Sequence, residues 1–546
     1  MLLKNVKVLR PKTTKIQKRN GIGYVYQVIG KSYKKDKKYT VENRKLIGKM
    51  IDEEWMIPNE YFEQYYPDVC VEQETPEFSD TLRIGCFLVV QKLFRDLQIE
   101  DVLSSIFGDL GSFIEDIVSY MITNESCTFQ YYSNFMRNHP VMDKNIRDDT
   151  QISRLLKYNI KEQDINLFLR AWNQMNNTKE CIYVGYDSTN FNTNAYGIEL
   201  ADYGHPKVDE GLPQYNLAYA VNQKDSTPLF YELYDGSVID NTELEIMLEE
   251  AKEYGHEKLG VLMDRGYISE KNIKALRTKG YEYILMMKQN QRICQEIIEE
   301  YGAAVQSLEG YYIGEHGVYG TTVKKQLYGQ ETNIHVYYDD IRASEEKVAL
   351  MSRYETWEKE IEKKVSKRIA TEGEMKKYRK VFKLKYDQNG YLVAYQRNSR
   401  YIKEEIRNLG FFFIITSEEM SASKALDIYR GRDNIEKMFR SLKSGIDFNK
   451  ARVHTTESLK SKVFVTFIAM IVRNELFQKA EVLRKKNRKA YTVPGMISEL
   501  ENIECTRNSV GKYRRKYALT AKHKLILKQF DMDEKYIDRS IGEFSY

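Results

Sequence analysis

The segment CIYVGYDSTNF (residues 181–191) decides the fold class, because it reads as a buried strand that ends in polar residues. Two further strand-like segments follow it, QYNLAYAV (214–221) and PLFYELY (228–234), separated by turn-forming Asn, Asp, Gly and Pro residues. The pattern then predicts a helix over 242–255, a buried strand over 258–264, a helix over 269–280 and a strand over 281–288. Three strands followed by alternating helices and strands predict a mixed α/β sheet.

Two aspartates follow buried strands of this sheet. Asp187 stands at the end of the apolar run 182–186, and Asp264 follows the apolar residues GVLM before a turn. If their strands are neighbours, both carboxylates project from one rigid edge and can meet. Taken singly, each aspartate is more often a turn or helix-capping residue.

A third carboxylate, Glu436, lies in the segment YRGRDNIEKMFRSLK (429–443). If this segment is one helix, four polar residues fall within roughly 60° of one face: Tyr429, Arg432, Glu436 and Lys443. Apolar residues form an adjacent stripe that can seat the helix on the sheet: Ile428, Ile435, Phe439 and Leu442. An ordinary solvated helix face with ion pairs between successive turns explains the same pattern.

Charge is segregated along the chain although the net charge of the 546 residues is only +5. Residues 1–49 hold 15 Lys/Arg and 2 Asp/Glu, residues 51–80 hold no Lys/Arg and 10 Asp/Glu, and residues 479–528 hold 14 Lys/Arg and 4 Asp/Glu. The basic N-terminal part also alternates as a β-hairpin with tyrosines. This part reads either as an arm that contacts DNA phosphates or as an edge strand kept soluble by lysine.

Neither a membrane span nor a cysteine-based site is predicted. The longest apolar run, 463–472, has ten residues, about half of what a membrane helix needs. The six cysteines are scattered without a C-x-x-C pair, which fits reduced thiols in the cytoplasm. The seven histidines are scattered too, so any metal must be held mainly by carboxylates.

Six consecutive regions are predicted. They are a basic hairpin arm with an acidic linker (1–80), a helical DNA-binding or dimerisation region (81–178), a first catalytic part (179–290), an inserted subdomain (291–409), a second catalytic part with the glutamate helix (410–478) and a basic C-terminal region (479–546). The inserted subdomain is expected to contain tyrosine-rich strands, a densely charged helix over 344–380 and a hairpin turn at 387–390.

Taken together, these features resemble the DDE-class transposases of bacterial insertion sequences, in the superfamily with the Y-(2)-R-(3)-E-(6)-K signature. Tyr429, Arg432, Glu436 and Lys443 match that signature in residue type and spacing. The resemblance also covers YVGYDSTNF around the first aspartate and GVLMDRGY around the second, and it spans about 180–475. The first motif reads Asp-Ser-Thr where many relatives have Asp-Gly-Thr.

The resemblance implies a ribonuclease H-like catalytic domain, interrupted by a β-rich and helical insertion, in which Asp187, Asp264 and Glu436 hold two Mg²⁺ ions, with Mn²⁺ as an alternative. Such a domain hydrolyses phosphodiester bonds at the element ends and joins the freed 3′-OH groups to target DNA. Arg432 and Lys443 are expected to bind phosphates, and Tyr429 to contact the backbone or an unstacked base.

The expected partners are double-stranded DNA and further copies of the chain, as a homodimer or larger assembly on DNA. We expect a cytoplasmic, nucleoid-associated bacterial protein. Two alternatives stay open: an inactive or domesticated DNA-binding protein, which an intact acidic triad disfavours, and a ribonuclease H-like nuclease that cuts DNA of a particular structure without joining strands.

Overall fold

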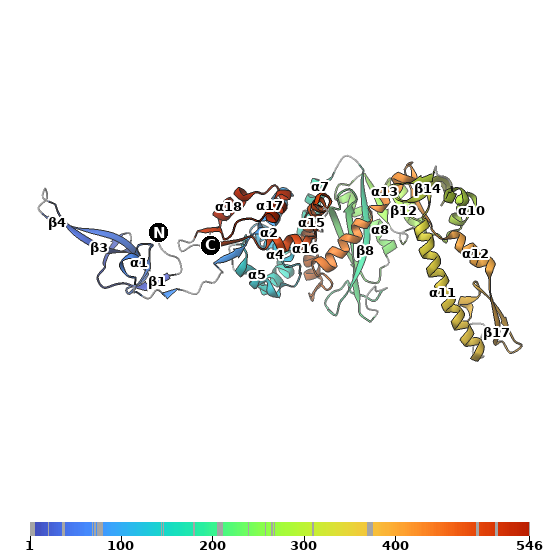
Figure 1. Ribbon diagram of the computed structural model, residues 1–546, viewed down its shortest axis with the longest axis horizontal. Coiled ribbons are helices and arrows are strands. Elements are labelled where there is room, and N and C mark those ends of the chain that lie inside the picture. The colour runs from blue at the N-terminus through green and yellow to red at the C-terminus, as the bar shows by residue number, and fades with distance from the viewer. Residues whose placement is uncertain are drawn as a thin grey trace. The chain divides into compact units, whose positions relative to one another are not determined.

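The computed structural model describes residues 6–19, 21–34, 39–67, 69, 72–73, 80–143, 145, 147–177, 181–204, 211–238, 240–256, 258–263, 266, 268–307, 311–367, 375–487, 491–507 and 512–544. Two compact units make up the chain (Figure 1). The first unit comprises Met1–Phe168, Ala195–Ile198 and Arg440–Tyr546, and the second comprises Leu169–Asn194 and Glu199–Phe439.

A nine-stranded sheet is the framework of the second unit, with the strand order β10-β9-β8-β11-β12-β18-β15-β14-β13. Its strands are β8 (Ile182–Asn192), β9 (Gln214–Asn222), β10 (Pro228–Asp235), β11 (Leu259–Met263), β12 (Glu282–Met286), β13 (Tyr312–Ile313), β14 (Val318–Leu327), β15 (Gln330–Tyr338) and β18 (Phe411–Thr416). β11 runs parallel to both β8 and β12, whereas the other neighbours are antiparallel. The predicted mixed α/β sheet is therefore confirmed.

Apolar side chains on both faces bury the central strands of this sheet. Every residue of β11 and of β18 is buried, as expected of strands that are covered on two sides. Helix α13 packs on the sheet through Leu426 and Tyr429, which share a cluster with Leu262, Ile284 and Ile414. The helices of this unit around the sheet are α8 (Asp240–Glu253), α9 (Glu270–Lys279), α10 (Arg292–Ser307), α13 (Ala422–Arg430) and α14 (Asp433–Arg440).

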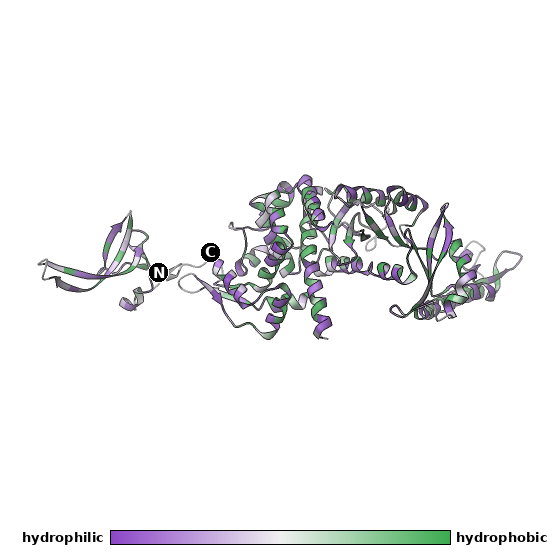
Figure 2. Ribbon diagram, turned by 90° about the horizontal axis from the view of Figure 1, so that it is seen from above, coloured by the Kyte–Doolittle hydropathy of each residue, from purple (hydrophilic) through white to green (hydrophobic). Residues whose placement is uncertain are grey.

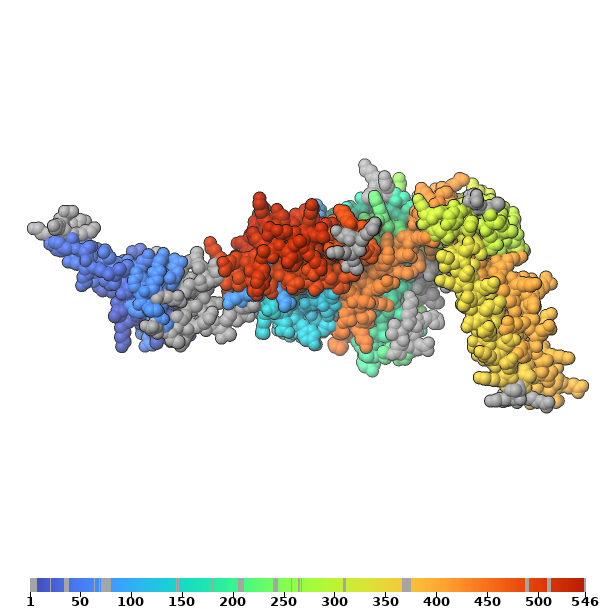
Figure 3. All heavy atoms as spheres, in the orientation of Figure 1, coloured from blue at the N-terminus to red at the C-terminus, as the bar shows by residue number. Residues whose placement is uncertain are grey.

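The segment between β15 and β18 has a small core of its own. It contains α11 (Asp340–Lys367), the 3-10 turn η6 (Lys376–Tyr378), β16 (Phe382–Tyr386), β17 (Leu392–Arg397) and α12 (Ser399–Asn408). Tyr354, Ile361, Phe382, Leu392 and Ile402 meet in that core, and α11 lies beside β17. In Figure 3 the yellow residues of α11 lie along the orange residues of the hairpin segment. The predicted hairpin turn is present, since Asp387 Oδ1 accepts the N–H groups of residues 389 and 391. Of the predicted helix over 344–380, residues 344–367 belong to α11, which already begins at 340, whereas residues 376–378 form a 3-10 turn instead of an α-helix. Residues 368–374 lie outside the described residues.

Two sheets and a set of helices build the first unit. A six-stranded sheet, in the order β2-β3-β4-β5-β1-β6, has its own core of Val8, Val25, Ile47, Met56 and Phe62. Its strands carry both hydrophilic and hydrophobic residues (Figure 2), and β3 and β4 pair as an antiparallel hairpin. Its strands are β1 (Val6–Leu9), β2 (Lys15–Arg19), β3 (Ile22–Lys34), β4 (Tyr39–Met50), β5 (Trp55–Pro58) and β6 (Glu72–Gln73); the second sheet has β7 (Thr81–Arg83), β19 (Glu504–Arg507) and β20 (Tyr513–Arg515).

Helix α15 (Thr456–Asn487) contains the apolar run 463–472, whose residues are all buried. The run therefore belongs to the protein core, and no helix in the described ranges is both long and apolar enough to cross a membrane. The other helices and helical turns are α1 (Phe62–Tyr65), α2 (Gly85–Asp96), α3 (Ile99–Phe107), α4 (Leu110–Thr123), η2 (Phe129–Tyr131), α5 (Tyr132–Asn138), α6 (Asp149–Arg154), η3 (Leu155–Asn159), α7 (Glu162–Asn176), η7 (Ser441–Gly445), α16 (Val493–Leu500), α17 (Ala521–Leu527), η8 (Lys528–Phe530) and α18 (Glu534–Glu543).

Candidate active site

Asp187 lies in the middle of β8, not at the end of its strand as the sequence predicted. β8 continues to Asn192 because residues 184–192 pair with β9, and Asp187 lies opposite Tyr219. The ladder of hydrogen bonds with a long neighbour thus holds polar residues in a strand that their own propensity does not favour. The side chain of Asp187 is half-buried, and its Oδ1 accepts the N–H of Ser188.

On its other side, Asp187 lies just beyond the end of the parallel pairing with β11. The last registered pair between β8 and β11 joins Gly185 to Leu262. Asp187 therefore lies beyond the last residue of β8 that is paired with β11. On that side its backbone is outside the ladder of hydrogen bonds between the two strands. Asp264, the second predicted carboxylate, lies outside the described residues.

Helix α14 packs on the face of the sheet that carries Asp187. Gly185 shares this face because it is two residues before Asp187, and a Cβ atom at Gly185 would lie 3.9 Å from the Cβ of Ile435. Tyr219 also shares it, since directly paired residues point to the same side. The ring of Tyr219 meets that of Phe439 edge-on, with centroids 5.8 Å apart. The helix that carries Glu436 and the strand that carries Asp187 are therefore packed together.

Glu436 points away from the buried face of α14, and half of its side chain is exposed. Its Oε1 accepts a hydrogen bond from Arg432 Nη2 at 2.6 Å. The side chain of Arg432 is itself only 15% exposed, and its Cζ lies 5.9 Å from the ring centroid of Tyr429. A carboxylate, a cation and an aromatic ring thus form one connected group at the start of α14.

The predicted continuous helix over 429–443 is wrong. Helix α13 ends at Arg430, α14 begins at Asp433, and η7 is a π-helical turn, so the four signature residues do not share one regular face. The break lies at Gly431, where an added Cβ would come within 1.2 Å of Gln223 Nε2. Gln223 Nε2 donates to the carbonyl of Ile428 at 3.1 Å, and its own N–H donates to Tyr183 O. Gln223, the residue that follows β9, therefore fixes the corner between the helices.

Tyr429 and Lys443 lie in different surroundings. The side chain of Tyr429 is 6% exposed and belongs to the core under α13, so its predicted contact with DNA stays a prediction. Lys443 lies in η7, within the first unit, and is half-buried. Its carbonyl accepts a hydrogen bond from Asn449 Nδ2 at 3.0 Å.

A buried arginine that the sequence analysis did not single out holds the π turn. Arg473 of α15 donates from Nε to Ser441 Oγ at 2.9 Å and from Nη2 to Glu125 Oε1 at 2.6 Å. A Cβ at Gly445 would come within 2.5 Å of Arg473 Nε, so glycine leaves the space that the guanidinium needs. The sequence signal for Arg473 was its position, because it is the first charged residue after the run VFVTFIAMIV (463–472), in which Thr466 is the only polar residue.

Among the described residues, no cluster of three or more His, Cys, Asp or Glu side chains is arranged to hold a metal ion. The chemistry of the predicted ligands nevertheless fits a hard divalent cation, because all three are carboxylates and Glu436 already pairs with a cationic group. Burial raises the pKa of the Tyr219 phenol opposite Asp187, so that this phenol stays neutral.

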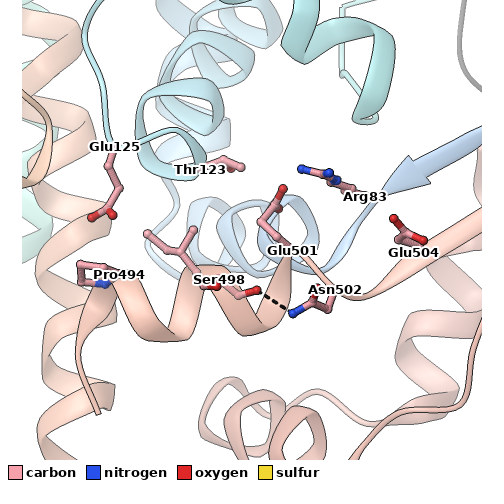
Figure 4. Close-up of a pocket in the computed structure, with 9 residues that line it drawn as sticks. Arg83, Thr123, Glu125, Pro494, Ser498, Glu501, Asn502 and Glu504 are labelled. Atoms are coloured by element: carbon pink, nitrogen blue, oxygen red, sulfur yellow. Dashed lines mark hydrogen bonds between the residues drawn. The ribbon is translucent and has the colours of Figure 1, made fainter. Parts of the chain in front are cut away.

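A cavity of about 380 Å³ lies within the first unit (Figure 4). Its lining includes three carboxylates, and two of them are paired elsewhere: Glu125 with Arg473, and Glu504 with Lys516. The third, Glu501, contacts His139 Nε2 at 2.8 Å. None of the predicted site residues lines this cavity, so it is distinct from the group around Asp187 and Glu436.

Comparison with known proteins gives a family for the chain. The family model described as a transposase DDE domain matches residues 184–472, which is more than half of the 546 residues. No curated protein matches the chain by sequence. Among solved structures, the chain is similar to a piggyBac transposase synaptic complex with hairpin DNA, at 9% identity and a TM-score of 0.36, covering 84% of this chain and 85% of that one. On the extent of the family match, the chain belongs to the transposases with a DDE domain.

Proposed function

We propose that this transposase binds the ends of its mobile element, hydrolyses phosphodiester bonds to free 3′-OH groups and joins these to target DNA. The observation that supports this most is the packing of α14, with Glu436, on the sheet face of Asp187. Asp187, Asp264 and Glu436 would hold two divalent ions, Mg²⁺ or Mn²⁺, which supply Lewis-acid stabilisation of the attacking and leaving oxygens. Without cations, converging carboxylates repel one another, which favours a metal over an empty triad.

The register between β8 and β11 supports a place for Asp264 in this triad. Gly185 and Leu262 form the last registered pair, and each predicted aspartate is two residues further along the sequence. β8 and β11 are parallel neighbours, which is the condition under which the two predicted aspartates can meet. We therefore propose that Asp264 acts together with Asp187.

We propose that Arg432 and Lys443 bind phosphates beside the scissile bond, Arg432 through its planar fork and Lys443 as a point charge. Arg432 would also hold Glu436 in place before a metal binds, because it pairs with that carboxylate in this structure. Since the ring of Tyr429 is buried, this residue would act mainly by packing against the guanidinium of Arg432. Contact of Tyr429 with DNA would be limited to the edge of its ring.

We propose a ribonuclease H-like catalytic domain, which the strand order β10-β9-β8-β11-β12 and the parallel pairing of β8, β11 and β12 support. We retain residues 291–409 as its insertion and residues 1–80, 81–178 and 479–546 as DNA-handling regions. A homodimer or larger assembly on DNA, in the cytoplasm of a bacterium, completes the proposal.

Replacing Asp187 by Asn tests the proposed reaction. The amide keeps the shape of the side chain but lowers its affinity for a hard cation, so we expect metal-dependent cleavage of the element ends to fall by at least about a hundredfold. Binding of the same ends in EDTA should be retained. Asp225→Asn is the matched control, because Asp225 lies in the turn between β9 and β10 and its Oδ1 accepts the N–H of Thr227 there. Undiminished cleavage by Asp187→Asn would refute the assignment.

Whether strands are joined requires a second substrate. An element end that already carries a free 3′-OH bypasses hydrolysis and reports strand transfer alone. Transfer to a plasmid target by the unmodified chain, lost in Asp187→Asn, would support a transposase. Cleavage without transfer would instead support the alternative of a nuclease.

A further inference from the structure

The β16–β17 hairpin has two faces of different chemistry. Phe382 and Leu392 point inward and are buried against α11 and α12. Lys383 and Lys385 alternate with them and are exposed. Opposite these lysines, β17 presents Gln396 and Ala394, both exposed as well. The outer face of the hairpin, called the lysine face below and defined by Lys383 and Lys385, therefore carries positive charge and no acidic residue.

Acidic side chains are present nearby but are engaged elsewhere. On α11, Glu358 pairs with Arg397, and Glu362 Oε1 accepts a hydrogen bond from Tyr395 Oη at 2.9 Å. Glu360 contacts Lys377 at 3.3 Å and also accepts from Tyr378. Glu358 and Glu362 are thus engaged by residues of β17, and Glu360 by residues of η6.

The lysine face is left without compensation within the described residues, where neither Lys383 nor Lys385 forms an ion pair. Residues 375–398 hold seven Lys/Arg and one acidic residue, Asp387, which caps the hairpin turn. Like charges two residues apart on one face of a strand repel one another. Such an arrangement is stabilised by a polyanionic partner that lies across it.

We propose that the lysine face binds the phosphate backbone of duplex DNA without reading its sequence, an inference that rests on the proposed action on DNA. Two positions along a strand span about 7 Å, which corresponds to the axial rise of about two nucleotides of one DNA strand. Lysine meets phosphate as a point charge and does not select a base. This segment then holds DNA at a place separate from the carboxylates that act on it.

The composition of the face favours a duplex over a single strand. Binding of single strands relies on aromatic side chains on which unpaired bases stack. The lysine face has none, since its neighbours across the hairpin are Gln396 and Ala394. An alternative role for lysines on a two-stranded ribbon is to prevent its pairing with a strand of another molecule. The experiment below separates this role from DNA binding.

The test compares the full chain with a Lys383→Gln/Lys385→Gln variant on a short duplex unrelated to the element ends. Fluorescence anisotropy in EDTA gives the affinity as a function of salt between about 50 and 200 mM KCl. Loss of two phosphate contacts should lower the slope of log affinity against log salt by about 1.8. Lys383→Arg/Lys385→Arg should keep the original slope, because the charge is retained.

Lys271→Gln/Lys274→Gln on α9 is the matched control, since both lysines are exposed and pair with glutamates. It should leave the slope unchanged. An unchanged slope in the hairpin variant would overturn the proposal, as would aggregation with intact DNA binding, which would assign the lysines to edge protection. Loss of single-strand binding alone would overturn it too. Because EDTA removes any metal, the result is independent of cleavage, and failure of the proposed reaction remains a separate outcome.

Discussion

Glu436 and Tyr429 both contact Arg432 and so fix the orientation of its guanidinium, which matters for the phosphate binding that we propose for it. Glu436 accepts from its Nη2 at 2.6 Å, and the ring of Tyr429 lies 5.9 Å away. An arginine that is already oriented loses little side-chain freedom when it binds a phosphate. The same pairing restricts the orientation of the Glu436 side chain, half of which is exposed to solvent.

Arg432→Ala should therefore weaken binding of element ends and lower the salt slope by about one, the value for one lost phosphate contact. Lys437→Ala is the matched control, because Lys437 is an exposed neighbour on the same helix. Gel-shift titrations at several salt concentrations measure both. Equal effects of the two substitutions would show that the helix contributes only diffuse charge.

His256 sets a pH dependence of stability that is independent of catalysis. Asn173 donates both of its amide hydrogens to carbonyls, so its Oδ1 accepts from His256 Nε2 at 2.7 Å. His256 Nδ1 is then the unprotonated nitrogen, and it is buried with no hydrogen-bond partner in the described part of the chain. Burial lowers the pKa of His256 to about 4, against about 6.5 in the unfolded chain.

Because the folded-state pKa is lowered, the unfolded chain binds the proton first, and stability falls as the pH drops from about 6.5 towards 4. The loss at pH 5 is about 2 kcal/mol. His256→Gln keeps a donor for Asn173 but does not titrate, so this part of the loss should vanish. Urea denaturation at pH 5 and pH 7.5, monitored by circular dichroism, measures it. A variant as acid-sensitive as the original chain would contradict the assignment.

At the scale of elements, uniformly buried strands could be predicted from the sequence, but the break in the signature helix could not. β11 is a short apolar run before a turn-like segment, and it forms where the pattern predicts a buried strand over 258–264. The corner at Gly431 depends on Gln223, which is more than 200 residues earlier in the chain. Local periodicity carries no information about such a partner. For the same reason the sequence places the end of the strand at Asp187, too early by five residues. The polar residues that follow stay in the strand because they pair with β9.

Arg473→Ala should destabilise the first unit by roughly 2 to 4 kcal/mol. The substitution leaves Glu125 without its partner and removes the support of the π turn at Ser441. Arg484→Ala on the same helix is the matched control, since its pair with Glu481 is exposed, and it should change stability by less than about 0.5 kcal/mol. Chemical denaturation compares them. Similar unfolding midpoints for both variants would show that η7 is held by its other contacts.

At the scale of the whole chain, two of the basic regions belong to a different compact unit from the predicted carboxylates that the structure describes. The six-stranded sheet and the basic C-terminal region both belong to the first unit, whereas Asp187 and Glu436 belong to the second. This segregation explains why a net charge of +5 says little about the partner. A phosphate-binding surface and a metal-binding group need opposite local fields, and separate elements allow both in one chain.

Deleting residues 1–73 tests whether the six-stranded sheet is an arm for DNA. Among the described residues, the core under this sheet is built from positions 8–69, such as Val8 and Ile47 of the sheet and Phe62 of α1, so the melting temperature of the rest should be unchanged. The deletion removes the 15 Lys/Arg of residues 1–49, and the salt slope of duplex binding should fall by at least about two. The alternative is that the lysines of this sheet only keep its edge strands soluble. In that case the slope should not change. Anisotropy titrations over a range of salt decide between the two, and an unchanged slope with an intact fold would leave DNA binding to the remaining basic surfaces.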